Sequence, residues 1–193
     1  MTRTTLLACL LLGSGVAFAQ STANTVQRDV NQQQRIEQGL QSGALSTKEA
    51  ATLEREESRV DRMQTNALKD GKLTPAEQAK LNQAQNKVST DIYGAKHNNV
   101  TGNPQSASSQ RMQADVQRNI NQQQRIENGV QNGSLTNHEA AKLERGQSKV
   151  AKAEARAGSD GHVSANEQAH VQHAENHQSK RIYRQKHDAQ QKN

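Results

Sequence analysis

An internal repeat with a period of 90 residues constrains this chain more than any other feature. Residues 26–97 align without gaps on residues 116–187, and 35 of the 72 aligned pairs are identical. A repeat of this length predicts two similar structural modules. The intervening residues 98–110 (NNVTGNPQSASSQ) are polar, include Gly102 and Pro104, and lack any periodicity. They predict a flexible linker.

Each repeat carries three helical patterns. In the first pattern, apolar residues recur within an arc of about 120° on a Gln-rich helix. The next two patterns begin with a Ser or Thr followed three residues later by Glu, which is a capping box. These pairs are Ser46 with Glu49, Thr74 with Glu77, Thr136 with Glu139, and Ser164 with Glu167. In the second pattern, Ala50, Leu53, Val60 and Met63 are expected to face inward.

We therefore predict an all-α fold with two tandem three-helix modules, each running up, down and up, joined by the flexible linker. The predicted boundaries are 20–97 for the first module and 111–193 for the second. Leu, Ile and Val form only about an eighth of the chain after residue 19, below the roughly 20% of an ordinary folded domain. A large core is excluded, so a module folds by itself or by docking on its twin.

The first 19 residues match a secretory signal peptide. Arg3 is followed by the apolar run from Leu6 to Leu12 and by Ala17-Phe18-Ala19, a small-x-small cleavage signature before Gln20. Cleavage there exports the protein to the periplasm or the medium and removes Cys9, the only cysteine. No later stretch is long and apolar enough to cross a bilayer.

The turn from Asp70 to Glu77 (DGKLTPAE) resembles the second half of an EF-hand calcium loop, as does its copy from Asp160 to Glu167. The resemblance implies calcium ligands at Asp70, Glu77, Asp160 and Glu167. The first half of the loop departs from the pattern, because Leu68 and Gly158 stand where side-chain oxygens are required. A second interpretation is that each Glu caps a helix, which requires no metal.

Three histidines in the third helical pattern of the second repeat offer another metal site. His170, His173 and His177 fall within about 60° of one another on one helix face, and Glu167 borders that face. Imidazoles one turn apart bind Zn, Ni or Cu. The alternative is a solvated polar face, since the first repeat has Lys80, Gln83 and Lys87 at the matching positions.

Most of the chain after residue 19 also resembles a group of small exported bacterial proteins. The likeness rests on Arg35-Ile36 and Arg125-Ile126 near the start of each repeat, and on the matching residues 92–97 and 182–187 (IYGAKH and IYRQKH) near its end. This resemblance implies no activity.

Charge and glutamines suggest partner binding without metal. The basic end of the chain, with Lys180, Arg181, Arg184, Lys186 and Lys192, favours an anionic surface polymer or lipid headgroups. Export argues against nucleic acid as a partner. Gln33 lies on the apolar stripe of the first helix, where it could pair with a second helix, either in a protein partner or through self-association.

Nothing in the sequence predicts an enzyme, because it contains no recognisable nucleophile motif or phosphate loop. Paired acids such as Glu56-Glu57 are expected on a charged helix face. We predict a non-catalytic exported helical binding protein. Divalent metal binding, with Zn, Ni, Cu or Ca as the ion, is the first hypothesis. Binding of a partner helix or an anionic polymer without metal is the second.

Overall fold

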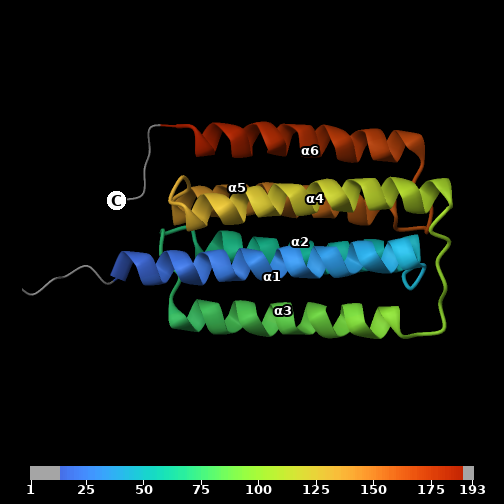
Figure 1. Ribbon diagram of the computed structural model, residues 1–193, viewed down its shortest axis with the longest axis horizontal. Helices are drawn as coiled ribbons and strands as arrows, with labels where there is room; N and C mark the ends of the chain where they lie inside the picture. The colour runs from blue at the N-terminus through green and yellow to red at the C-terminus, as the bar shows by residue number, and fades with distance from the viewer. Residues whose placement is uncertain (1–13, 189–193) are drawn as a thin grey trace, which may run out of the picture.

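The computed structural model of the protein describes residues 14–188 (Figure 1). Residues 1–13 of the predicted signal peptide, including Cys9, lie outside the described residues, as does Lys192. Residues 14–19, just before the predicted cleavage point, form the start of the first helix. No helix in the described part of the chain is both long and apolar enough to cross a membrane.

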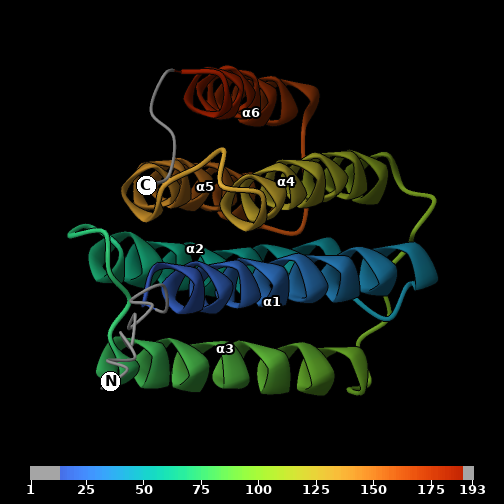
Figure 2. The same ribbon diagram turned by 60° about the vertical axis from the view of Figure 1, so that its left-hand side comes forward.

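Residues 14–188 form an all-α fold, as predicted, with six helices and no strand. The helices are α1 (Ser14–Ser42), α2 (Thr47–Ala67), α3 (Pro75–Lys96), α4 (Ala107–Gln131), α5 (Asn137–Ala157) and α6 (Ala165–Lys186). Figures 1 and 2 show them in four layers, with α3 on one outside, α1 and α2 next, α4 and α5 next, and α6 on the other outside. The second helix of each repeat runs back along the first.

Local sequence signals set the helix ends. All four predicted capping boxes are present, with the side chains of Ser46, Thr74, Thr136 and Ser164 each accepting a hydrogen bond from the backbone of the Glu three residues later. Four glycines adopt positive φ in the turns, where a residue with a Cβ would be strained. They are Gly43, Gly71, Gly133 and Gly161.

The two repeats dock through their first two helices. Helix α1 packs on α4, and α2 packs on α5. Ser58 and its repeat equivalent Ser148 meet at the centre, where each hydroxyl donates to the other residue's carbonyl oxygen, over 2.9 and 2.8 Å. Two equivalent residues can touch only near a two-fold axis. The repeats are therefore related by a pseudo-two-fold axis that passes between α2 and α5.

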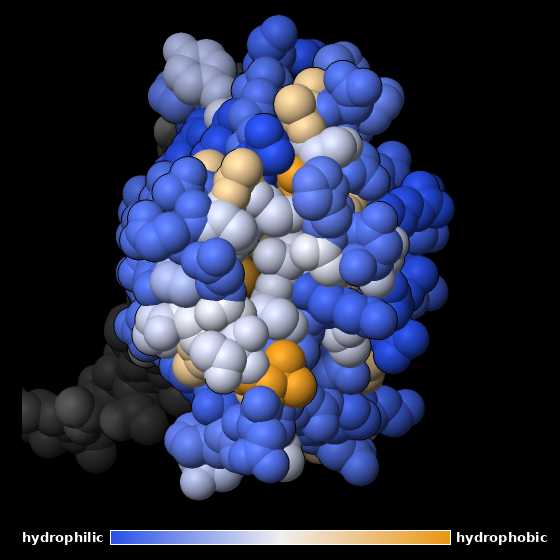
Figure 3. All heavy atoms as spheres, turned by 90° about the vertical axis from the view of Figure 1, so that its right-hand side faces the viewer, coloured by the Kyte–Doolittle hydropathy of each residue, from blue (hydrophilic) through white to orange (hydrophobic). Residues whose placement is uncertain are grey.

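Both hydrophobic clusters of the protein draw on both repeats. One joins Ile36, Leu40 and Leu53 to Met112 and Val116. The other joins Val26 and Leu73 of the first repeat to residues of the second such as Ile126 and Leu143. Few apolar residues are exposed, and the face in Figure 3 is mostly hydrophilic. Neither repeat has a cluster of its own among the described residues.

Two details differ from the sequence predictions. Met63, expected to face inward, is 36% exposed, because the inward positions on that part of α2 are taken by Asp61 and Gln64. Helix α4 begins at Ala107, with Ser106 as its N-cap, so the last four residues of the predicted linker are helical. The rest of this segment contacts the α1–α2 turn, where the Gly102 amide donates to the Gly43 carbonyl over 2.8 Å.

The shared clusters predict that one repeat does not fold alone as a monomer. We expect a fragment of residues 20–98 to lose more than about half of its helical circular dichroism signal, because α1 and α2 lose the faces that cover them. It should regain helix only in a concentration-dependent dimer. Sedimentation and circular dichroism across a concentration series would measure this, with residues 20–193 as the control. A cooperatively folded monomeric fragment would contradict the prediction.

Candidate metal centre between the repeats

The interior of the protein contains an unusual number of buried carboxyl groups. Eight Asp and Glu side chains are at most 2% exposed outside the capping boxes: Asp29, Glu54, Glu57, Asp61, Asp115, Glu144, Glu154 and Glu175. A buried carboxylate is costly unless it is protonated, paired or bound to a metal. Six of these groups lie along α1, α2 and α5, whereas Asp115 is on α4 and Glu175 is on α6.

Three of these carboxyl groups converge from three helices. Asp29 of α1, Asp61 of α2 and Glu144 of α5 each place a carboxylate oxygen within 4.8 Å of the other two. Within residues 14–188, they are the only three His, Cys, Asp or Glu side chains grouped so closely. Two oxygens bound at about 2.4 Å on opposite sides of one ion lie about 4.8 Å apart. The spacing of this carboxylate triad therefore fits a single divalent cation.

Glu57 supplies a fourth carboxyl group beside the triad. Its side chain is 1% exposed, and neither of its oxygens accepts a hydrogen bond from any residue between 14 and 188. Burial raises its pKa well above the ordinary value, and the nearby charge of Asp29 raises it further. The charge of Glu57 in turn raises the pKa of Asp61. An unpaired buried carboxylate at this position calls for a proton or a cation.

Glutamine amides hold the triad in place. Gln85 of α3 donates to Asp29 Oδ1 over 2.6 Å, and Gln64 of α2 donates to Asp29 Oδ2. Gln123 of α4 donates to Asp61 over 3.5 Å and to Glu144 over 3.4 Å, so it links carboxylates of both repeats. Gln123 is the repeat equivalent of Gln33, and both are buried. The Oε1 atoms of all three amides accept no hydrogen bond within the described chain.

Desolvation controls the protonation of these groups. Burial raises the pKa of Asp29 from 3.8 to about 7, although hydrogen bonds from Gln64 and Gln85 lower it. Burial raises the pKa values of Asp61 and Glu144 well above their ordinary range, with further increases from neighbouring acids. Without a cation, the triad therefore holds protons near neutral pH. A divalent cation would displace those protons, so its affinity should increase with pH.

The equivalent place on the other side of the pseudo-two-fold axis lacks this group of three carboxylates. Asn119 stands for Asp29, Ala151 for Asp61, and Glu54 for Glu144. Glu54 is buried near Glu154, and burial raises the pKa of both groups, that of Glu54 to about 7. Within residues 14–188, this twin site has no group of three carboxylates as close as the triad. The carboxylate triad is thus a single, asymmetric cluster.

The calcium ligands implied by the EF-hand resemblance are used by the turns themselves. Glu77 Oε2 accepts from the backbone amide of Thr74 over 2.9 Å, and Asp70 Oδ1 accepts from the Lys72 amide over 3.1 Å. In the second repeat Glu167 and Asp160 make the same bonds, to Ser164 and His162. These observations favour the capping interpretation. Calcium binding at these four residues stays a prediction.

The histidine face lies on the outer layer. His170, His173 and His177 are exposed along α6, and Glu167 is at its first turn. Their ligand atoms do not form a group as close as the buried triad. Exposed imidazoles can rotate toward a metal, so transition-metal capture by this face also stays a prediction.

The buried site was not predicted from the sequence, and the prediction that Glu57 lies on a charged helix face is wrong, because Glu57 is buried. A signal was present in the repeat alignment. Asp29, Glu57 and Asp61 have Asn119, Gln147 and Ala151 as equivalents, so the first repeat has three carboxyl groups where the second has none. Asp29 also lies beside Val30 on the apolar stripe.

Comparison with protein-family models, with curated proteins and with solved structures finds no significant match.

A separate acidic pair lies between α4 and α6. Burial and, to a lesser extent, the charge of Asp115 raise the pKa of Glu175 from 4.5 to about 8, although Arg118, 3.1 Å away, lowers it. Glu175 is 0% exposed, and the first repeat has Gln85 at this position. The folded protein therefore keeps a proton on Glu175 between about pH 4.5 and 8, where the unfolded chain loses it.

This shift predicts that stability decreases as the pH increases from 5 to 8. Because the folded-state pKa of an acid is raised, its contribution is complete below the unfolded pKa and is lost as pH approaches the folded pKa. We expect Glu175→Gln to raise the Tm at pH 8 by about 2–8 °C, corresponding to about 1–2 kcal/mol, and to change it little at pH 5. Thermal unfolding at both pH values measures this. An equal effect at both would contradict it.

Proposed function

We propose that the protein is an exported, non-catalytic helical protein in which two docked three-helix repeats bind one divalent cation. The observation that supports this most directly is the convergence of Asp29, Asp61 and Glu144, from three helices and both repeats, within 4.8 Å. The unpaired carboxyl group of Glu57 is independent support, because a buried acid without hydrogen bonds gains most from a cation.

The donor set favours a hard cation. Three or four carboxylates and the adjoining amide oxygens are ligands that Ca²⁺, Mn²⁺ and Mg²⁺ prefer. Ca²⁺ requires six to eight oxygens, which two bidentate carboxylates and an amide oxygen from Gln64 or Gln123 would help to supply. Zn, Ni and Cu would choose the imidazoles of α6 instead. The buried centre and the histidine face therefore predict different metal preferences.

A cation at this place would also join the repeats. Asp29 and Asp61 belong to the first repeat and Glu144 to the second, so one ion would link α1, α2 and α5. Because the unfolded chain has no preformed site, the free energy of binding adds to the stability of the docked state. We therefore propose that the cation stabilises the interface between the repeats.

A second candidate function is binding of an anionic polymer without metal. The specific observation in its favour is the exposed basic surface of α6, where Lys180 and Arg184 are both exposed. A surface of lipid headgroups or a partner helix would also contact these charged side chains. Neither candidate requires catalysis.

The metal proposal predicts that the metal-dependent stabilisation is lost when Asp29 and Asp61 are replaced by the residues at the equivalent positions of the second repeat. We expect saturating Ca²⁺ or Mn²⁺ at pH 7.5 to raise the Tm of the chain from residue 20 by about 5–10 °C, since a ligand at 100 times its Kd contributes about 2.7 kcal/mol. The variant Asp29→Asn with Asp61→Ala should show no such increase. Calorimetric titration and thermal unfolding of the metal-free protein provide the measurements.

Three controls make this experiment specific. Glu154→Gln, which changes only the twin site, should keep the metal-dependent increase. Asp70→Ala with Asp160→Ala tests the turns, and a triple alanine variant at His170, His173 and His177 tests the histidine face with Zn²⁺ and Ni²⁺. Without metal, the triad variant should be more stable than the natural chain at pH 7.5, because it buries fewer acids. Binding that persists in the triad variant, or no binding by the natural chain, would refute the buried site.

A further inference from the structure

The two outer layers carry the same shallow pocket. In the first repeat, a pocket of about 440 Å³ is lined by Arg35, Asn86, Ser89, Thr90 and Tyr93. In the second repeat, a pocket of about 320 Å³ is lined by Arg125, Ser179, Lys180, Tyr183 and Arg184. Arginine, serine and tyrosine occupy equivalent positions in both, between the first and third helices of the repeat. We call them the α1–α3 pocket and the α4–α6 pocket.

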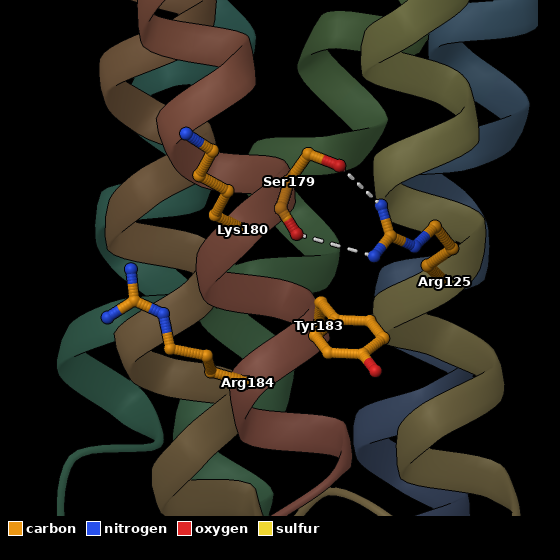
Figure 4. Close-up of a pocket in the computed structure, with 5 residues that line it drawn as sticks. All are labelled: Arg125, Ser179, Lys180, Tyr183 and Arg184. Atoms are coloured by element: carbon orange, nitrogen blue, oxygen red, sulfur yellow. Dashed lines mark hydrogen bonds between the residues drawn. The ribbon is translucent and has the colours of Figure 1, made fainter.

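Each arginine is fixed by two hydrogen bonds across the pocket. Arg125 donates to Ser179 Oγ over 2.7 Å and to the Ser179 carbonyl over 3.3 Å, as the dashed lines in Figure 4 show. Arg35 does the same to Ser89, over 2.5 and 3.1 Å. The guanidinium group is therefore held in one orientation while its remaining N–H donors stay available. A preorganised planar donor of this kind suits a carboxylate or a pair of hydroxyl groups.

A tyrosine ring forms the other side of each pocket. Figure 4 shows Tyr183 in the same gap between α4 and α6 as Arg125, whereas Lys180 and Arg184 extend from the other side of α6. Tyr183 is 59% exposed and its equivalent Tyr93 is 60% exposed. They are the only tyrosines in a chain without tryptophan. Large aromatic rings normally contribute to a core, but here both are on the surface.

A histidine ring stacks on each tyrosine ring. Tyr183 stacks on His187 with ring centres 4.2 Å apart, and Tyr93 stacks on His97 at 4.1 Å. Each histidine Nδ1 donates to the carbonyl of its tyrosine over 2.7 Å, which fixes the imidazole. One face of the tyrosine is thus covered, and the ring is held in position.

An exposed, fixed aromatic ring beside a fixed guanidinium group is the arrangement that binds a sugar ring bearing a carboxylate. The pyranose presents C–H groups to the aromatic face and excludes water from it, while its carboxylate accepts from the arginine. We propose that the α1–α3 and α4–α6 pockets are two equivalent binding sites for an acidic polysaccharide with uronic acid units. Their places on opposite outer layers would let one molecule bridge two polymer chains (Figure 2).

The two pockets differ in nearby charge. Lys180 and Arg184 belong to the lining of the α4–α6 pocket although their charged ends extend from the other side of α6 (Figure 4), whereas Thr90 and Gly94 are at the equivalent positions of the first repeat. Because additional cations strengthen attraction to a polyanion, the α4–α6 pocket should bind more tightly and with more salt dependence. The proposal relies on the proposed export, which brings the protein to such polymers. It identifies a site for the second candidate function and does not involve the metal centre.

Tyrosine fluorescence provides a direct test, because Tyr93 and Tyr183 are the only strong emitters after residue 20. The probe is hexagalacturonate added to residues 20–193 with EDTA present, followed by fluorescence and calorimetry. We expect two sites per chain. Tyr183→Ala should weaken the tighter site at least about tenfold and leave the other unchanged, and Tyr93→Ala should do the reverse. Calorimetry measures the binding of the alanine variants, and Tyr→Phe at each position should retain it.

Other outcomes would overturn the proposal. Maltohexaose, a neutral sugar, tests whether binding requires the carboxylate groups of the ligand. Dextran sulfate tests whether the protein surface attracts any polyanion. If dextran sulfate binds equally well and both alanine variants retain all binding, the surface is only a diffuse basic patch. If no sugar binds while the Tm of each tyrosine variant falls, the stacks only stabilise the helix ends. Because EDTA removes divalent ions, failure here would leave the metal proposal standing, and failure of the metal titration would not affect this result.

Discussion

Docking of α1 on α4 and of α2 on α5 is the interaction on which the rest of the structure depends. With so few Leu, Ile and Val residues, neither repeat covers its own helices, and both hydrophobic clusters combine residues of the two halves. Packing across the pseudo-two-fold axis therefore replaces the separate cores that two independent modules would need. The outer helices α3 and α6 then cover the remaining faces of this four-helix centre and carry the surface pockets.

The same docking explains why polar groups are buried. Where the repeats dock, α1, α2 and α5 bring carboxyl and amide groups to a common layer. Such a layer costs stability if it is charged, and it favours one register of the helices if all its members are paired. On one side of the axis the layer contains Glu54 and Glu154, whose pKa values are raised by burial. On the other side Glu57 remains unpaired beside the triad, and a cation would resolve the repulsion there.

Local features were predictable from the sequence, and tertiary ones were not. The capping boxes at Ser46 and Thr136 require only residues three apart, so the sequence defines them completely. The triad requires Asp29, Asp61 and Glu144 to meet across 115 positions of the chain, counting from residue 29 to residue 144. These three residues meet only when the two repeats dock. The periodicity of the apolar residues does not determine how the repeats are oriented in docking. Glu57 was misplaced for the same reason, since α2 is covered on two sides rather than one.

The contact between Ser58 and Ser148 has a consequence for how a single site can exist in a duplicated protein. In a homodimer of identical chains, every residue near the axis occurs twice, and a site one turn away would be accompanied by a copy related to it by the two-fold rotation. Joining the halves in one polypeptide removes that restriction, because each half can then change by itself. Asp61 and Ala151, three positions after the paired serines, show such divergence. The covalent connection thus gives the two halves the freedom to specialise while the geometry of a symmetric pair is retained.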